Sequence, residues 1–214
     1  MPKFTHIIWD WNGTLFDDAW LCRDVVNSML ISRNKPPLSE ERYQEVFDFP
    51  VKDYYQRAGF DFSVDPYEIL ANKFISEYER RRGECRLRAG AKDVLEGIAE
   101  AGLGQSILSV YSQKTLDDVV ASFGIPEYFI GIYGLDNHYA EGKIDIGRRM
   151  IAQASFKAER AVLIGDTTHD YEVACAIGAS CILMPGGHHA KQRLLQCGVA
   201  VMDSLQEILN YLLS

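Results

Sequence analysis

Asp10, Ser109, Lys143 and the pair Asp166 and Asp170 are the residues whose types and spacing could carry out chemistry. Asp10 ends an apolar, β-prone run, Ser109 ends another, and both later acids follow a third. A carboxylate can attack phosphorus as a nucleophile, and several carboxylates together offer the hard oxygen ligands that suit Mg²⁺. A lysine and a hydroxyl can neutralise and hold phosphoryl oxygens. These residue types therefore suit metal-assisted transfer of a phosphoryl group.

Each of these residues also has a structural explanation when it is taken alone. Asp10 or Asp170 could cap a helix, Ser109 could satisfy the backbone, and Lys143 could be solvated in a loop. Their order along the chain, each at a strand end or in a loop beyond one, favours a shared site.

The elements that must position these residues alternate regularly after residue 90. The sequence predicts strands over residues 5–10, 105–110, 129–133, 161–164, 180–183 and 200–202. It predicts intervening helices over residues 91–101, 113–123, 144–154, 170–177, 190–196 and 204–213. Such repetition implies a parallel sheet with right-handed crossovers.

The segment between residues 17 and 82 reads differently, because its periodicity predicts helices only. These cover residues 19–31, a second helix from Ser39, residues 51–58 and residues 66–82. We therefore expect an α/β fold: a Rossmann-like parallel sheet core with an inserted all-helical cap domain. Residues 1–15 and 86–214 would form the core, and residues 16–85 the cap.

Composition narrows the class of protein. The 214 residues are 47% hydrophobic and 24% charged, with a net charge of −8, which is typical of a globular protein and disfavours nucleic-acid or membrane-surface binding. No apolar run approaches the roughly 20 residues of a membrane span. The start of the chain leaves no room for a signal peptide, and the five cysteines form no CxxC pair. We expect a cytoplasmic protein with reduced thiols. Protein partners cannot be inferred from the sequence.

The chain resembles the haloacid dehalogenase-like (HAD) hydrolases over nearly its whole length. Residues 10–14, Asp-Trp-Asn-Gly-Thr, match the DxDGT motif of that family with one change, Asn12 for the second acid. Ser109, Lys143 within Glu-Gly-Lys, and the GDTTHD run at residues 165–170 match the other motifs in order. The resemblance is closest to the phosphoglycolate phosphatase-like branch with a helical cap.

The resemblance implies a role for each matching residue. Asp10 would be the nucleophile that forms an aspartyl-phosphate intermediate. Mg²⁺ would be bound by Asp10, Asp166 and the backbone carbonyl of Asn12, with Asp170 acting through water.

The phosphoryl oxygens would be held by Lys143, by the Ser109 hydroxyl and by turn amides near Gly13. The expected function is a Mg²⁺-dependent phosphatase acting on a small phosphorylated metabolite, with phosphoglycolate as the family-level suggestion.

Asn12 puts the rate of that reaction in question. In the family's phosphatases the aspartate at this position protonates the leaving group and later activates water, and an asparagine cannot relay a proton. General acid–base catalysis is worth ~10²–10⁴-fold, or roughly 3–5 kcal/mol of barrier. Three alternatives follow. In the first, the protein is a phosphatase that is slow, that prefers good leaving groups or that recruits another acid. In the second, it is a catalytically impaired phosphate-binding or regulatory protein. In the third, it catalyses a reaction that needs no such acid.

The third alternative resembles the family's phosphonoacetaldehyde hydrolases, which share the Asp-Trp start of the motif and use a cap lysine. Lys52 is the candidate for that lysine in this chain. Lys52 and Arg57 are also candidates to meet a carboxylate of the substrate.

Two further groups favour structural explanations. The arginines that cluster where the chain leaves the cap are predicted to form a solvated helix end rather than an anion-binding edge; they are Arg80, Arg81, Arg82, Arg86 and Arg88. His188 and His189 follow Pro-Gly-Gly and lack further ligands at zinc-like spacing, so they are predicted to lie in a surface turn.

Overall fold

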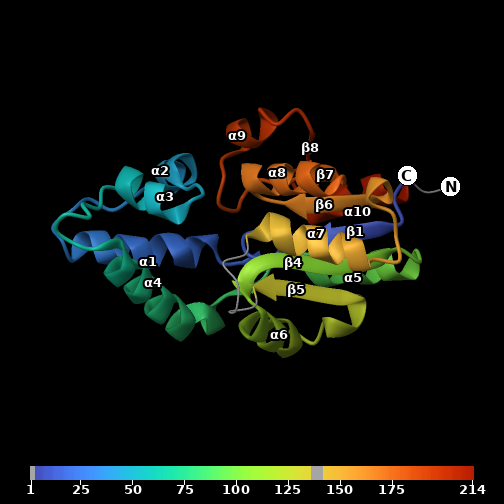
Figure 1. The fold of residues 1–214 in the computed structure, drawn as a ribbon, viewed down its shortest axis with the longest axis horizontal. Helices are drawn as coiled ribbons and strands as arrows, with labels where there is room; N and C mark the ends of the chain where they lie inside the picture. The colour runs from blue at the N-terminus through green and yellow to red at the C-terminus, as the bar shows by residue number, and fades with distance from the viewer. Residues whose placement is uncertain (1–2, 136–141) are drawn as a thin grey trace.

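The computed structural model describes residues 3–135 and 142–214. Its core is a six-stranded parallel sheet with the order β5-β4-β1-β6-β7-β8 (Figure 1). The strands are β1 (His6–Trp9), β4 (Gly104–Ser112), β5 (Gly131–Leu135), β6 (Ala161–Gly165), β7 (Ser180–Leu183) and β8 (Ala200–Val201). The chain moves from β1 to one side of the sheet and then returns to the other side at β6. The carboxyl end of β1 therefore lies at the point where the strand order reverses, where open α/β sheets bind ligands.

Helices cover both faces of this sheet because its central strands are apolar on both sides. Ile7 and Trp9 pack into one cluster, and Ile8, which points the other way, packs into a second. The first face is covered by α5 (Ala91–Glu100), α6 (Gln113–Ser122) and α10 (Leu205–Leu213). The second is covered by α7 (Lys143–Gln153) and α8 (Thr168–Ile177), and the short α9 (Lys191–Leu195) precedes β8. The predicted parallel α/β core is confirmed.

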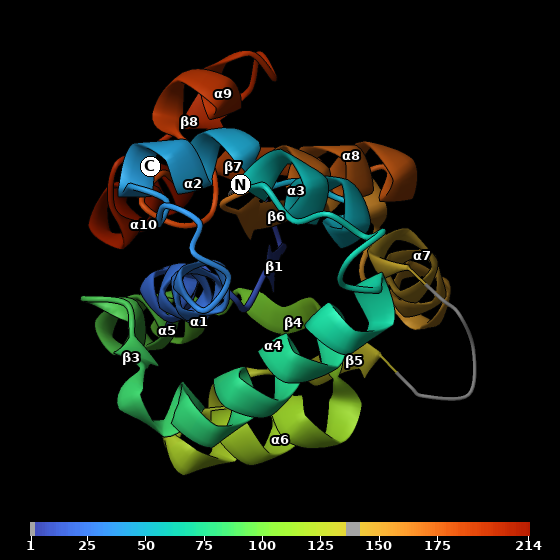
Figure 2. The ribbon, with the colours of Figure 1, turned by 90° about the vertical axis from the view of Figure 1, so that its left-hand side faces the viewer.

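The cap consists of four helices that stand at one end of the core (Figures 1 and 2). They are α1 (Ala19–Ile31), α2 (Glu40–Val46), α3 (Val51–Ala58) and α4 (Tyr67–Arg81). Ser39 caps α2 by accepting a hydrogen bond from the Arg42 amide, and Gly59 ends α3 in the left-handed conformation with φ 108°. The helical character predicted for this segment is confirmed.

A feature that the sequence did not reveal lies where the cap joins the core. The strands β2 (Phe16–Asp17) and β3 (Arg86–Leu87) pair antiparallel, so the chain enters and leaves the cap through one two-stranded ribbon. Two-residue strands carry too little periodicity to be recognised in a sequence. The division of the chain into 1–15 with 86–214 and 16–85 stays a prediction.

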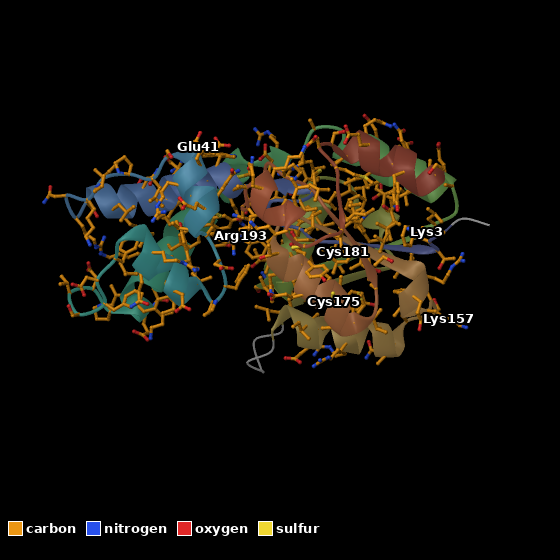
Figure 3. All side chains as sticks on the ribbon, turned by 90° about the horizontal axis from the view of Figure 1, so that it is seen from above. Lys3, Glu41, Lys157, Cys175, Cys181 and Arg193 are labelled. Carbon is orange, nitrogen blue, oxygen red and sulfur yellow. The ribbon has the colours of Figure 1, made fainter. Side chains whose placement is uncertain are left out.

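Hydrogen bonds and an ion pair hold the cap against the core on two sides. The guanidinium of Arg193, labelled in Figure 3 beside the cap, lies 2.7 Å from Asp48 Oδ2 and donates to the Phe47 carbonyl at 2.7 Å. On the same side, Gln44 donates to the Gly187 carbonyl at 3.2 Å. On the side of α4, the Tyr111 hydroxyl donates to Glu79 at 2.5 Å. No helix within residues 3–135 and 142–214 has the length and apolar character to cross a bilayer.

Candidate active site

Asp10, Asp166 and Asp170 meet at the carboxyl end of the sheet. Asp10 follows β1 and Asp166 follows its neighbour β6, so parallel pairing alone brings them to one edge. Asp170 belongs to the first turn of α8, where it completes a capping box with Thr167. One oxygen from each carboxylate lies within 4.8 Å of the others, and all three side chains are buried.

Lys143 is the cation at the centre of these acids. Its Nζ donates a hydrogen bond to Asp10 Oδ1 and another, of 2.6 Å, to Asp170 Oδ1. Burial alone would lower the pKa of this ammonium group, but the two carboxylates outweigh burial and raise it. Lys143 is therefore charged, and only 4% of its surface is exposed. Of the motif predicted around it, Glu141 lies outside the described residues.

One ammonium group does not balance three buried carboxylates. Burial raises the pKa of Asp10 to about 8 against the opposing effect of Lys143, and Asp170 and Asp166 raise it further. Burial and the charge of Asp170 raise the pKa of Asp166 to about 7. Burial also acts on Asp170, but Lys143 and Thr167 lower its pKa. A cluster of hard oxygen atoms with this excess of negative charge fits a divalent cation such as Mg²⁺.

Glycines let the surrounding loops close on Asp166. Gly13 has φ +79°, and a Cβ at that position would lie 2.4 Å from Asp166 Oδ2. A Cβ at Gly187 would lie 2.1 Å from the same oxygen. The Thr14 hydroxyl and the His188 amide donate to the two oxygens of Asp166 at 3.1 and 2.6 Å, which fixes the carboxylate in place.

The prediction that His188 and His189 lie in a surface turn is wrong. Both are buried, with 6% and 0% of their surface exposed. His188 Nδ1 pairs with the Tyr43 hydroxyl of the cap at 2.7 Å, and His189 Nδ1 accepts the Thr168 amide at the start of α8 at 3.0 Å. The Pro-Gly-Gly turn directs the two rings inward because it must bring its backbone onto Asp166, a long-range contact that local turn chemistry does not reveal.

Asp18 is a buried acid of the site that sequence reasoning missed. Its side chain is completely buried and accepts hydrogen bonds from Asn12 Nδ2 at 2.7 Å, from the Gly13 amide at 2.8 Å and from the Tyr78 hydroxyl at 2.5 Å. The Asn12 amide also donates to Tyr78 at 3.1 Å. The signal available in the sequence was the Asp17-Asp18 pair directly before a predicted helix, a position where an acid is expected to act as an exposed cap.

These hydrogen bonds hold two residues of the predicted site, Asn12 and Gly13. The Asn12 amide group is held between the core loop and the cap helix α4. The Gly13 amide, expected to face phosphoryl oxygens, donates instead to Asp18 and to the Phe16 carbonyl.

Ser109 lies at the site as predicted from its position in β4. Its hydroxyl is 1% exposed, accepts a hydrogen bond from the Tyr111 amide at 3.0 Å and lines the same cavity as Asp10 and Lys143. The hydroxyl proton remains available for donation, since the Tyr111 contact uses only a lone pair.

The cavity at this site has a volume of about 530 Å³ and extends from the carboxylates into the cap. Its cap side carries a set of rings that we call the aromatic wall: Tyr43, Phe47, Phe49, Tyr54, Phe74 and Tyr78. Phe74 stacks on Tyr78 with a centroid distance of 5.8 Å, and Phe47 stacks on His188 at 4.5 Å.

The structure does not bring Lys52 or Arg57 to the cavity. Lys52 is exposed on α3, with its Nζ 5.8 Å from the ring centres of Phe62 and Tyr67. Arg57 lies 3.5 Å from Asp48 and is 44% exposed. Neither side chain belongs to the lining of the cavity.

The five arginines named in the sequence analysis differ in their contacts. Three of them pair with glutamates three residues away, as a helix end would: Arg80 with Glu77, Arg81 with Glu84 and Arg82 with Glu79. Arg86 donates to the carbonyls of Gly83, Glu84 and Cys85. Arg88 departs from the prediction of a solvated side chain. It donates to the carbonyls of Gly13 at 2.5 Å, Gly186 at 3.0 Å and Pro185 at 3.2 Å, and thus ties the two loops around Asp166 together.

Comparison with known proteins defines the class to which this fold and site belong. The family model of the haloacid dehalogenase-like hydrolases matches residues 7–184, and the chain belongs to that family. A haloacid dehalogenase-like family hydrolase from Streptococcus pneumoniae superposes with a TM-score of 0.83 at 20% identity, and the match covers 98% of each chain.

The curated relatives carry two kinds of name. The tyrosine-protein kinase PtkA of Mycobacterium tuberculosis is 26% identical over 187 residues, 85% of this chain and 62% of that protein. The chain thus spans less than two thirds of the length of that relative. The phosphoglycolate phosphatase of Synechococcus elongatus is 21% identical over 198 residues, 88% of this chain and 87% of that protein.

Proposed function

We propose that this protein is a Mg²⁺-dependent phosphatase that hydrolyses a small phosphate monoester through an aspartyl-phosphate on Asp10. The observation that carries the proposal is the convergence of Asp10, Asp166, Asp170 and Lys143 at one end of the sheet, buried and lining one cavity. Membership of the hydrolase family and the phosphatases among its relatives support it.

The residues of the site divide the work. Asp10, Asp166, the backbone carbonyl of Asn12 and, through water, Asp170 would hold Mg²⁺, which supplies positive charge to the phosphoryl oxygens when bound. Lys143 orients the Asp10 carboxylate and adds a second positive charge beside those oxygens. The Ser109 hydroxyl donates to a phosphoryl oxygen from the β4 side.

The reaction then proceeds in two displacements at phosphorus. An Asp10 oxygen bonds to phosphorus while the bond to the leaving oxygen breaks, and that oxygen departs with the electron pair. Water then attacks the acyl-phosphate, which restores the Asp10 carboxylate, and the water proton passes to solvent or phosphate. Asn12 supplies no proton in either displacement, so turnover of ordinary alkyl esters is slow.

Intact mass spectrometry tests this proposal directly. Incubation with acetyl phosphate and Mg²⁺ should add one phosphoryl group to the protein, because Asn12 provides no base to hydrolyse the intermediate. The adduct should be absent from Asp10→Asn and from samples treated with a chelator. Asp17→Asn is the matched control, since Asp17 is an exposed acid of the same loop. A wild-type protein that neither forms an adduct nor turns over any phosphate ester would contradict the proposal.

The second candidate is a phosphate-binding or regulatory protein without turnover. The hydrogen-bonded, non-titrating Asn12 amide favours it. Calorimetric binding of inorganic phosphate, together with the absence of both adduct and turnover, would establish this alternative in place of the first.

A further inference from the structure

The cavity that holds the catalytic carboxylates is far more apolar than a carboxylate-bearing metabolite requires. From the chemistry of its lining we propose that the substrate is an aryl phosphate monoester, whose uncharged ring occupies the aromatic wall and whose phenolate leaves without a proton donor. This inference rests on the proposed phosphatase function and names the substrate class of the same site.

The charged residues that line the cavity argue against a leaving group that carries a carboxylate. Within residues 3–135 and 142–214, Lys143 is the one lysine or arginine that lines it, and the eight remaining residues of the chain contain neither type. Asp18 and Glu79 line the cavity as well. A carboxylate on the leaving group would therefore be desolvated beside like charges, with no lysine or arginine left to pair with it, which is strongly unfavourable.

The histidines of the cavity do not change this balance. The His188 ring is buried and already pairs through Nδ1 with the Tyr43 hydroxyl at 2.7 Å. His169 already pairs with Glu172 at 3.0 Å.

The size and shape of the cavity suit a ring. A volume of about 530 Å³ falls within the roughly 300–1,000 Å³ of sites that enclose drug-sized ligands. Tyr78 contacts two neighbouring rings, Phe74 in a stack and Tyr111 edge to face. Aromatic side chains in such arrangements bind another ring by stacking and edge contacts worth roughly 0.5–1.5 kcal/mol beyond the area buried.

The missing acid supplies an independent reason for a phenolic leaving group. Asn12 donates both of its observed hydrogen bonds to Asp18 and Tyr78 and cannot protonate a departing oxygen. A phenol has a pKa near ~10, as in tyrosine, whereas an aliphatic alcohol resembles water, with a pKa near ~16. Phenolate therefore leaves as the anion and takes its proton from solvent afterwards, while an alkoxide needs a donor at the site.

Three phosphate esters test the inference on the wild-type protein with Mg²⁺. Phenyl phosphate and benzyl phosphate present the same ring but differ in leaving group, and phosphoglycolate presents a carboxylate. We expect kcat/KM for phenyl phosphate to exceed that for benzyl phosphate at least ~100-fold, the lower end of a general acid's contribution. Benzyl phosphate should inhibit phenyl phosphate turnover competitively, since its ring fits, and phosphoglycolate should neither turn over nor inhibit at the same concentration.

Variants of α4 test the role of the aromatic wall separately. Phe74→Ala should raise KM for phenyl phosphate about fivefold, the scale of one lost ring contact. Ile69→Ala is the control, because Ile69 is 50% exposed on the same helix and lies outside the lining. Phe74→Leu, which keeps the bulk but removes the ring, should show the same KM effect with a smaller loss of stability.

The outcomes separate this inference from the proposed function. If the adduct forms from acetyl phosphate but phosphoglycolate or benzyl phosphate is hydrolysed as well as phenyl phosphate, the aryl assignment is overturned and the phosphatase stands. If phenyl phosphate is preferred but KM is unchanged in both Phe74 variants, the assignment of the ring to the aromatic wall is overturned. If neither adduct nor turnover occurs, both proposals are overturned.

Discussion

The core side and the cap side of the cavity are lined by residues of different character. The core side gathers titratable groups, three carboxyl groups and Lys143, and gives each of them a hydrogen-bond partner. The cap side gathers aromatic rings, and among the residues that the structure describes the buried Tyr54 hydroxyl finds no hydrogen-bond partner. The core side is thus built to hold charge in a fixed place, whereas the cap side is built to accept an apolar group. In the proposed function, the core side therefore carries the reaction and the cap side binds the leaving group.

The strongest test of this separation compares two lysines. Lys143→Met removes the cation from the core side and should lower turnover of phenyl phosphate by about 10²–10³-fold, the usual cost of one donor at a developing oxyanion. Lys52→Met changes the exposed cap lysine and should leave kcat and KM unchanged. Steady-state kinetics of both variants give the comparison. A large effect of Lys52→Met would contradict this separation and support the hypothesis that a cap lysine reacts with the substrate.

His189, which is buried at the boundary between the two sides, predicts a dependence of stability on pH. Burial lowers the pKa of His189 to about 3, below the value of about 6.5 in an unfolded chain. The unfolded state therefore binds this proton more readily between pH 6.5 and 3, so the contribution of His189 to stability falls as the pH decreases through that range. Asp10 and Asp166, whose pKa values are raised, act in the opposite direction. The loss expected from His189 alone between pH 7 and pH 5 is about 2 kcal/mol.

Urea unfolding of the wild type and His189→Gln at both pH values measures this loss. The variant keeps an acceptor for the Thr168 amide but does not titrate, so the stability of the wild type relative to the variant should be about 2 kcal/mol lower at pH 5 than at pH 7. Equal slopes for the two proteins would mean that water reaches the boundary between cap and core.

The smallest expected effect concerns Asn12, whose amide group cannot titrate. Asn12→Asp should raise kcat for benzyl phosphate at least ~10-fold, a floor beneath the usual general acid–base contribution, and should raise that for phenyl phosphate less. Parallel kinetics with the two esters measure the ratio. If both rates rise equally, the substitution acts through the geometry of the loop rather than through protonation of the leaving group.

The contrast between the two sides also explains how much could be predicted from the sequence. Asp10 and Asp166 follow apolar runs, and parallel pairing of neighbouring strands brings such strand-end residues to one edge whatever lies between them. Their juxtaposition, and the α/β core around them, could therefore be predicted from local patterns. The assignment of catalytic roles to these residues stays a prediction.

The parts that could not be predicted depend on contacts across long stretches of chain. His188 and His189 are buried because their loop closes on Asp166, and Asp18 is buried because Tyr78, sixty residues later, covers it. The cap positions Lys52 and Arg57 were chosen for charge, but α3 turns its aromatic residues inward and leaves both cations outside. An amphipathic helix indicates that one face is buried without indicating what that face meets.

The ribbon of β2 and β3 has a mechanical consequence. Both crossings between cap and core pass through it, and Asn12 forms a bridge with Phe16 of that ribbon. A rotation of the cap relative to the core would have to bend this ribbon, and Asn12, two residues after Asp10, would move with it. The ribbon therefore couples the orientation of the cap to the backbone of the loop that carries Asp10.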